Sequence, residues 1–387
     1  MNKIRLENIS MSFGEKIALD DINLEVEKGK YIVILGPSGA GKTTLLKVIA
    51  GLFKPKKGHI YIDEDKNITN FPPEARKIAF LPQNYALFPK KTVWENISFS
   101  PKIQKLPNAN ELIKEFLLMV HLTDRPDAYP HELSGGMKQR TALGRALATN
   151  FSIMLLDEPL RALDARLRLE LRNELKSMVK DLGFTVFHVT HDQEEAFSLG
   201  DTIVILNQGR IQQIGKQEEL YRNPINEFVA SFLGEVNKQY SNIKVKTSSV
   251  HRDGFDYIAN LENDVKIKLY SNKLFEIDQK ILLIIKSESI KIITIKKENK
   301  PAIGIKKYDS NDNNIELKLN TEKSNWFKGT ILQKYYLGKY TNIEVKTEGF
   351  SDNKGILTAK LSSRKAVKFE PEDIVWLQIK PEHILII

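Results

Sequence analysis

The chain has 387 residues, which is too long for one ordinary domain, and its 58 basic and 49 acidic side chains leave a formal net charge of +9. The absence of cysteine excludes disulfides and thiolate metal sites and fits a reducing compartment. No run reaches the roughly 18 uncharged apolar residues of a membrane helix, and the first residues carry no apolar signal core. We therefore expect a chain that is soluble by itself.

The positive charge is concentrated in the second part of the chain. Residues 1–234 hold 31 basic and 29 acidic side chains, which leaves 27 and 20 for residues 235–387. The lysines there alternate with apolar residues, as in Lys266-Ile267-Lys268-Leu269, and this alternation is typical of half-buried strands with one solvated face. A nucleic-acid surface is the alternative, but the segment has only two arginines and no binding motif. We expect no nucleic-acid partner.

The first two predicted strands, residues 3–9 and 17–27, form an antiparallel flap. The second alternates apolar and polar residues until Lys28-Gly29 turns the chain. Phe13 lies at the turn between the strands, where it could stack on an adenine or simply pack. Its position alone leaves both interpretations open.

A glycine-rich stretch follows, between a predicted strand and a predicted helix. Residues 31–35 are apolar and β-branched enough for a buried parallel strand, and apolar residues recur at helical spacing after the glycines. Gly36, Gly41, Lys42 and Thr43 match the pattern G-x-x-x-x-G-K-[ST], in which backbone N–H groups and the helix dipole hold a polyphosphate. Lys42 would reach the β and γ phosphates, and the Thr43 hydroxyl would bind Mg²⁺. The expected nucleotide-binding residues here are Gly36, Pro37, Ser38, Gly39, Ala40, Gly41, Lys42, Thr43 and Thr44.

Residues 92–149 have a helical pattern that contains a second potential anion site. Ser134 is a good helix N-cap, and Gly135 and Gly136 leave the first helical N–H groups sterically open. A capped helix with a glycine start is common, so this motif alone is only moderately specific.

Two later strands end in polar residues. The apolar strand at 153–156 ends in Asp157, which could hold Mg²⁺, and in Glu158, which could orient or deprotonate an attacking water. The strand predicted at 185–190 ends in His191, for which a γ-phosphate contact and a structural role both remain open. A further strand at 202–206 and the turn at 207–209 close the predicted sheet.

Beyond Gly234 the helical pattern gives way to short strands separated by turn residues, as in small β-barrels. The segments 281–292 and 375–387 share the pattern Ile-Lys-x-Glu-x-Ile, which predicts two related β lobes.

Together these motifs resemble the ATPase subunits of ABC transporters over about residues 1–234. The resemblance rests on the loop at 36–43, Gln83, the segments 133–140 and 153–158, Leu163-Asp164 and His191. It implies an α/β P-loop NTPase (ABC ATPase) core with an antiparallel β flap and a helical subdomain at about 92–149. The tail, residues 235–387, looks like the all-β, OB-like transport-associated domain of one importer branch.

The resemblance also implies roles for individual residues. Glu158 would be the catalytic carboxylate, with His191 and Gln83 as further catalytic residues. Gln83 would also join Thr43 and Asp157 at the metal. Phe13 would stack on the adenine, and the nucleotide would further contact Asp157, Asp164 and, in an opposing subunit, Ser134, Gly135 and Gly136.

The implied function is ATP hydrolysis, with ATP and Mg²⁺, in a homodimer that drives solute import. Its partners would be integral-membrane permease subunits and, indirectly, a solute-binding protein, which places the chain peripherally on the cytoplasmic face of the cell membrane. The solute stays open among an oxyanion, a polyamine, iron and a sugar. The alternative function is a soluble ABC-type ATPase in DNA maintenance or translation, which would need a coiled-coil insertion or a second cassette that this sequence lacks.

Three positions depart from the family pattern. Met137 replaces the commonest Gln of the Ser134 motif. Arg161 stands where a small residue usually precedes the Leu-Asp pair, which would put a large cation near the dimer seam. Lys90-Lys91 replaces a His-aliphatic pair on the surface that receives the permease in this family.

Overall fold

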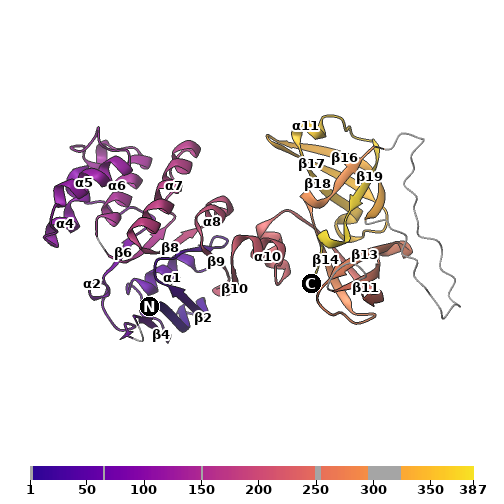
Figure 1. The fold of residues 1–387 in the computed structure, drawn as a ribbon, viewed down its shortest axis with the longest axis horizontal. Coiled ribbons are helices and arrows are strands. Elements are labelled where there is room, and N and C mark those ends of the chain that lie inside the picture. The colour runs from indigo at the N-terminus through magenta and orange to yellow at the C-terminus, as the bar shows by residue number, and fades with distance from the viewer. Residues whose placement is uncertain (1–2, 64–65, 150, 249–253, 295–323) are drawn as a thin grey trace. The chain divides into compact units, whose positions relative to one another are not determined.

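The structure is a computed structural model that describes residues 3–63, 66–149, 151–248, 254–294 and 324–387. The chain divides into two compact units, residues 1–222 and 223–387 (Figure 1). The domain boundary that we expect at residue 234 from the loss of helical pattern stays a prediction. Among the described residues, no helix is long and apolar enough to cross a membrane.

A six-stranded sheet is the centre of the first unit. Its order is β10-β9-β3-β8-β7-β6, parallel except for the antiparallel edge strand β10. The strands are β3 (Tyr31–Leu35), β6 (Ile78–Leu81), β7 (Ile153–Asp157), β8 (Thr185–Thr190), β9 (Thr202–Asn207) and β10 (Arg210–Gly215). Every residue of β3, β7 and β8 is buried, as expected where parallel strands are covered on both faces.

A second, four-stranded sheet of the first unit confirms the predicted antiparallel flap. Its order is β2-β1-β4-β5, with β1 (Lys3–Phe13), β2 (Lys16–Glu27), β4 (Lys57–Ile62) and β5 (Lys66–Asn67). Apolar residues of the flap share one core with the central sheet; Leu6 and Ile22 of the flap join Ile32 and Phe187 in this core.

The helices of the first unit connect these strands. They are α1 (Lys42–Ile49), α2 (Pro73–Arg76), α3 (Val93–Ile97), α4 (Phe99–Ile103), α5 (Ala109–Met119), α6 (Gly135–Leu147), α7 (Ala165–Leu182), α8 (Gln193–Leu199) and α9 (Gln217–Arg222). Helices α3 to α6 form the predicted helical region. Gly144 of α6 allows close packing there, because a Cβ at this position would lie 3.0 Å from Cδ1 of Ile97 in α3.

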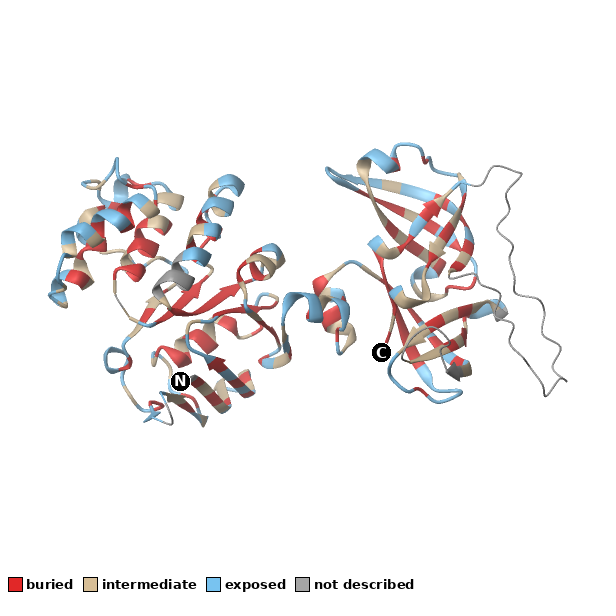
Figure 2. Ribbon diagram, viewed as in Figure 1, coloured by how far each residue is buried: buried red, intermediate tan, exposed pale blue. Residues whose placement is uncertain are grey.

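The second unit begins with helix α10 (Glu227–Leu233) and continues as two five-stranded antiparallel sheets. The first has the order β13-β12-β11-β14-β20 and the second β15-β19-β16-β17-β18. Their strands are β11 (Val236–Ser248), β12 (Phe255–Asn260), β13 (Lys266–Ser271), β14 (Lys280–Lys286), β15 (Lys291–Ile293), β16 (Asn325–Leu337), β17 (Tyr340–Thr347), β18 (Ile356–Ser362), β19 (Ile374–Ile379) and β20 (Ile384–Ile386). Both sheets contribute to a single apolar core, whose residues include Leu283, Ile343, Phe369 and Leu377 (Figure 2).

The two Ile-Lys-x-Glu-x-Ile segments have the same local structure. Each is a strand, a 3₁₀ turn and a second strand, with the turns at Ser287–Ser289 and Pro381–His383. The first segment passes from β14 in one sheet to β15 in the other, and the second passes from β19 back to β20 in the first sheet. The repeated pattern therefore marks two reciprocal crossings between the sheets.

Candidate nucleotide-binding site

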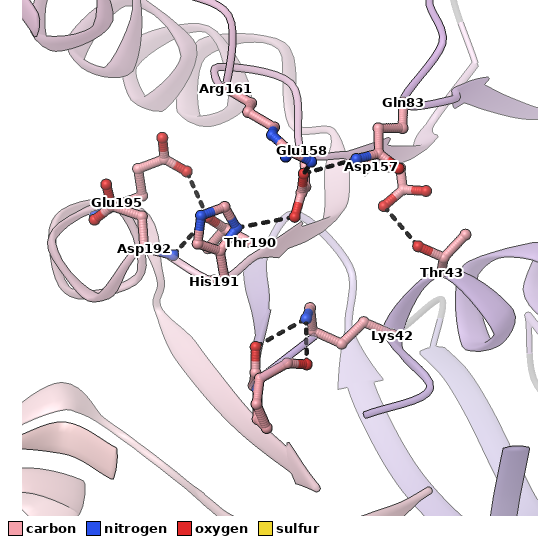
Figure 3. Close-up of polar contacts among 12 residues, drawn as sticks. Lys42, Thr43, Gln83, Asp157, Glu158, Arg161, Thr190, His191, Asp192 and Glu195 are labelled. Carbon is pink, nitrogen blue, oxygen red and sulfur yellow. Dashed lines mark hydrogen bonds and ion pairs between the residues drawn. The ribbon is translucent and has the colours of Figure 1, made fainter. Parts of the chain in front are cut away.

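The predicted site residues of the first unit gather at the carboxyl ends of four neighbouring parallel strands. The loop with Lys42 follows β3, Asp157 ends β7, His191 follows β8 and Gln83 follows β6. Because β3, β8, β7 and β6 are successive neighbours in the sheet, these side chains converge, as Figure 3 shows.

The loop after β3 needs its glycines for space and for backbone conformation. A Cβ on Gly36 would lie 2.1 Å from the carbonyl oxygen of Leu206. Gly41 has φ 102°, and a Cβ there would lie 2.4 Å from the carbonyl oxygen of Ala18. This loop leads directly into α1, so its N–H groups and the helix N-terminus are available to a polyphosphate. The glycines of this loop and the N-terminus of α1 therefore suit the phosphate groups of a nucleotide.

Lys42 is buried and is held against the same loop. Its Nζ donates hydrogen bonds to the carbonyl oxygens of Gly36 (2.8 Å) and Pro37 (2.9 Å). Burial lowers the pKa of Lys42, and the negative charges of Glu158 and Asp157 oppose that effect. These two carbonyl oxygens hold the Lys42 ammonium group against the start of the loop that follows β3 (Figure 3).

Thr43 and Asp157 form the pair expected of a magnesium site. The Thr43 hydroxyl donates a hydrogen bond of 3.1 Å to Oδ1 of Asp157, whose side chain is buried. Burial raises the pKa of Asp157 and the nearby charge of Glu158 adds to this, although the bond from Thr43 opposes it. No group of three or more His, Asp or Glu among the described residues could form a metal cage. A hydroxyl and one carboxylate suit Mg²⁺, which usually keeps waters and shares substrate phosphates.

Glu158 makes the densest set of contacts in the site. Its Oε2 accepts hydrogen bonds from Nη1 of Arg161 (2.7 Å) and Nε2 of Gln83 (3.0 Å), and its Oε1 lies 2.9 Å from Nδ1 of His191. Burial favours the neutral acid, but the hydrogen bonds and charges of His191 and Arg161 outweigh it, so the pKa of Glu158 lies below its usual value. Glu158 is thus an anion held by three neighbours (Figure 3).

The backbone of Glu158 is in the left-handed region, with φ 50°. Such a conformation costs a non-glycine residue free energy and persists only where its surroundings over-determine it. Its N–H donates to the carbonyl oxygen of Val189 (2.9 Å), and its carbonyl oxygen accepts from Nε2 of Gln139 (3.1 Å). Oε1 of Gln139 also accepts from the N–H of Ala162 (3.0 Å). The motif analysis included Gln139, a buried side chain of α6, only within the segment 133–140 and gave it no role, because no spacing rule links it to the turn after Glu158.

A buried polar network lies behind His191. Oε2 of Glu195 accepts from the Thr190 hydroxyl at 2.7 Å and lies 3.4 Å from Nε2 of His188, and Nδ1 of His188 lies 2.8 Å from the Tyr31 hydroxyl. Burial opposes ionisation of Glu195, but its bonds to His188 and Thr190 lower its pKa overall. This network anchors the loop that carries His191 to β3 and α8. The sequence analysis did not find it.

The remaining predicted residues make no side-chain hydrogen bond or ion pair with this cluster among the described residues. The hydroxyl of Ser134 accepts from the N–H of Met137 (3.2 Å) as N-cap of α6, and Gly135 beside it is exposed. Asp164 caps α7 by accepting from the N–H of Leu167 (3.0 Å). A Cβ on Gly136 would lie 3.4 Å from Cδ2 of Leu163. The other predicted residues belong to the loop after β3 and the first turn of α1; they are Ser38, Gly39, Ala40 and Thr44.

Phe13 lies at the end of β1, where its side chain is 46% exposed. Its ring and that of Phe53 pack in a T-shaped arrangement, with centroids 5.4 Å apart. Part of the ring surface therefore remains open for stacking.

Comparison with known proteins gives consistent results for both parts of the chain. Residues 19–161 match the ABC transporter family, and residues 313–387, the first of which lie outside the described residues, match the TOBE domain family. The spermidine/putrescine import ATP-binding protein PotA of Lawsonia intracellularis is 42% identical over 297 residues, which cover 76% of this chain and 79% of that protein. The PotA protein of Bacteroides fragilis is 48% identical over 236 residues, covering 60% of this chain and 51% of that protein.

Among solved structures, the chain is similar to the ATP-binding cassette MJ0796 in a dimeric, post-hydrolysis state bound to ADP and Pi. The identity is 33% and the TM-score 0.51, and the match covers 55% of this chain and 98% of that one. A second dimeric structure of the same cassette matches at 34% identity with the same TM-score and coverage.

Proposed function

This chain belongs to the ABC transporter family as an importer-type ATPase with a C-terminal TOBE domain, and we propose that two copies of it enclose ATP to drive uptake of a polyamine through a membrane permease. The observation that carries the hydrolytic part is Glu158, an ionised carboxylate beside the Thr43–Asp157 pair and His191. The dimeric state of the similar cassette supports two copies, and the names of the relatives support a polyamine as solute.

The chain's own residues divide the chemical work. The loop at 36–44 and Lys42 hold the phosphates and offset their charge. Glu158 accepts a proton from the attacking water, and His191, which contacts Glu158, orients that carboxylate and the transferred phosphoryl group. Phe13 offers the face of its ring to the adenine.

Thr43 and Asp157, together with Gln83, are the residues that would hold Mg²⁺. When bound, this ion neutralises charge on the β and γ phosphates. The hydrogen bond between Thr43 and Asp157 already orients both side chains.

The second copy would contribute Ser134, Gly135 and Gly136. Ser134 and Gly135 are exposed at the start of α6, so their hydroxyl and N–H groups can face a nucleotide bound on another chain. Asp164, exposed at the start of α7, would lie along the same seam. Hydrolysis would then open the dimer and move the permease, with the solute delivered by a separate binding protein at the far side of the cell membrane. The ATPase itself would work at the cytoplasmic face.

Replacing Glu158 by Gln tests the hydrolytic role. Glu158→Gln keeps the size of the side chain but removes its charge and the base, so kcat should fall about 10²- to 10⁴-fold with ATP binding retained. Steady-state hydrolysis and nucleotide titration measure both. Glu170→Gln is the matched control, because Glu170 pairs with Arg166 on the exposed face of α7. Hydrolysis by Glu158→Gln at the wild-type rate would remove the proposed role.

The solute is tested by transport. Cells that express this chain with its permease and binding protein should take up labelled spermidine or putrescine, and Glu158→Gln should abolish that uptake. Uptake of sulfate, iron or maltose in place of the polyamine would overturn the solute assignment and leave the ATPase assignment intact.

A further inference from the structure

His191 is a half-exposed side chain whose direction depends on the backbone that carries it. Its side chain is 53% exposed, and its Nδ1 lies 2.9 Å from Oε1 of Glu158. Thr190, the residue before it, is the last residue of β8 and pairs in register with Leu35 of β3. His191 therefore lies just past the end of the sheet, and whatever fixes the chain there decides where its imidazole points.

A closed cycle of three hydrogen bonds spans His191 (Figure 3). The Thr190 hydroxyl donates to Oε2 of Glu195 (2.7 Å) and accepts from the N–H of Asp192 (3.0 Å). Oδ1 of Asp192 in turn accepts from the N–H of Glu195 (3.1 Å). Because a hydroxyl has one proton, its bond to Glu195 fixes the lone pairs that face Asp192. The residues on both sides of His191 are thus tied to one carboxylate.

This cycle departs from the usual start of a helix. Residues 192–195 have the sequence DQEE, which is typical of a capping box, in which the glutamate accepts directly from the N–H of the N-cap residue. Here the Thr190 hydroxyl stands between Asp192 and Glu195, and the Glu195 side chain is only 5% exposed. A buried carboxylate is costly to desolvate, and an exposed capping box would hold α8 without that cost. Helix capping therefore does not explain why Glu195 points inward.

Inside the protein, Glu195 contacts a chain of buried side chains that reaches β3. Its Oε2 lies 3.4 Å from Nε2 of His188, and Nδ1 of His188 lies 2.8 Å from the Tyr31 hydroxyl. Both His188 and Tyr31 are almost completely buried, and Tyr31 is the first residue of β3. These contacts hold the segment around His191 against the strand that leads to the phosphate loop.

We propose that Thr190 and Glu195 are positioning residues, whose hydrogen bond sets the backbone around His191 and so aims its imidazole at Glu158 and at the transferred phosphoryl group. Both side chains are buried, so they act through His191 and not on the nucleotide itself. This positioning role rests on the proposed role of His191 in hydrolysis. Its loss should slow turnover and spare ATP binding, because the loop at 36–44 holds the phosphates.

The first test removes the Thr190 hydroxyl. Thr190→Val does so at nearly constant volume, and Thr190→Ser keeps the hydroxyl. Thr185→Val is the matched control, because Thr185 is equally buried at the other end of β8 and its hydroxyl accepts from the N–H of Gly29 (3.0 Å). Thr190→Val should lower kcat roughly 10- to 100-fold and leave KM within about two-fold, since misplacing a catalytic group costs rate more than binding. Thr190→Ser and Thr185→Val should keep the wild-type kcat.

Two further variants test Glu195 as the acceptor. Glu195→Gln keeps an oxygen for the Thr190 hydroxyl, whereas Glu195→Met removes that oxygen at similar length. Glu195→Gln should stay within about three-fold of the wild-type kcat, and Glu195→Met should match the loss in Thr190→Val. The double variant Thr190→Val/Glu195→Met should lose no more than either single variant, because both break the same bond.

Hydrogen exchange of the nucleotide-free, full-length chain gives a readout that is separate from turnover. The amide of Asp192 should exchange faster in Thr190→Val than in the wild type, and the amide of Gly29 should do so in Thr185→Val. Chemical denaturation should show similar losses of stability in the two valine variants, because each leaves one N–H without its acceptor. A loss of kcat in Thr190→Val alone would then reflect the aim of His191 and not general damage.

The outcomes separate the positioning role from the role of His191. In the His191→Ala background, Thr190→Val should leave the residual kcat unchanged. A wild-type kcat in Thr190→Val alongside an inactive His191→Ala overturns the positioning role alone, and so does an equal loss of kcat in Thr185→Val. An active His191→Ala overturns the role of His191 and the positioning role with it.

Discussion

The two units of this chain use their polar residues in opposite ways. In the first unit a parallel sheet collects polar side chains from four loops at one edge, so Lys42, Asp157, Glu158 and His191 act on one another. In the second unit the lysines of β13 point outward one by one, with Ile267 and Leu269 buried between them, although β11 also buries polar side chains at Asn237, Gln239 and Ser241. Lysines that alternate with apolar residues therefore indicate the solvent-exposed face of a strand in the second unit. Polar residues at the ends of parallel strands indicate a functional site in the first unit.

Core truncations in each unit should separate stability from nucleotide binding. Phe369 and Phe187 are both fully buried, the first in the core of the second unit and the second in β8. Phe369→Ala and Phe187→Ala should each lower the free energy of unfolding by about 3–5 kcal/mol. Only Phe187→Ala should weaken ATP binding, because β8 carries His191.

Chemical denaturation measures the free energy of unfolding of the two variants, and nucleotide titration of the same samples measures their affinity for ATP. If Phe369→Ala weakened ATP binding as much as Phe187→Ala, the division of roles between the units would be wrong.

Removing Gln139 should damage both stability and catalysis. Gln139→Ala leaves the carbonyl oxygen of Glu158 and the N–H of Ala162 without their partner, at a cost of roughly 1–3 kcal/mol, and loosens the turn that aims Glu158. We expect kcat to fall while KM changes little. Gln104→Ala is the control, since it removes hydrogen bonds to Ser100 and Thr149 in the helical region. Equal loss of kcat in both variants would show that Gln139 acts only through stability.

The smallest expected effect on folding concerns helix caps. Ser134→Ala and Asn226→Ala each remove an N-cap, from α6 in the first unit and α10 in the second, at about 1 kcal/mol. Ser134→Ala should in addition reduce ATP-dependent dimerisation and hydrolysis, which Asn226→Ala should leave unchanged. Size-exclusion chromatography of each variant in the Glu158→Gln background, with ATP, measures the dimer. An unaffected dimer in Ser134→Ala would argue against a composite site.

Local patterns predicted the centre of the first unit well because its strands are short, apolar and bounded by polar motifs. The bounds of β3 and β8 agree with the sequence prediction. The edge strand β10 was missed after the turn at 207–209, because its sequence RIQQIG is neither continuously apolar nor cleanly alternating.

The contacts within the site were harder to predict than its members. The family resemblance identified Gln83 and the end of the strand at 153–156 identified Glu158, but their hydrogen bond joins residues 75 positions apart. The same holds for the pair of Tyr31 and His188 and for Gln139, which depend on how the strands order themselves in the sheet. The contact between Arg161 and Glu158 is local, yet it depends on the left-handed backbone at Glu158, which no residue type there signals.

The reciprocal crossings in the second unit have a consequence for the order of folding. Strand β14 has β11 on one side, but its other edge is completed only by β20, where Leu283 faces Ile386 about a hundred residues later. Until β20 is synthesised and docked, β14 keeps an open edge of apolar residues, which is where other chains can pair. Such distant pairing also makes folding slow. We therefore expect newly made chains to be most prone to aggregate while this unit is still folding, before β20 pairs with β14.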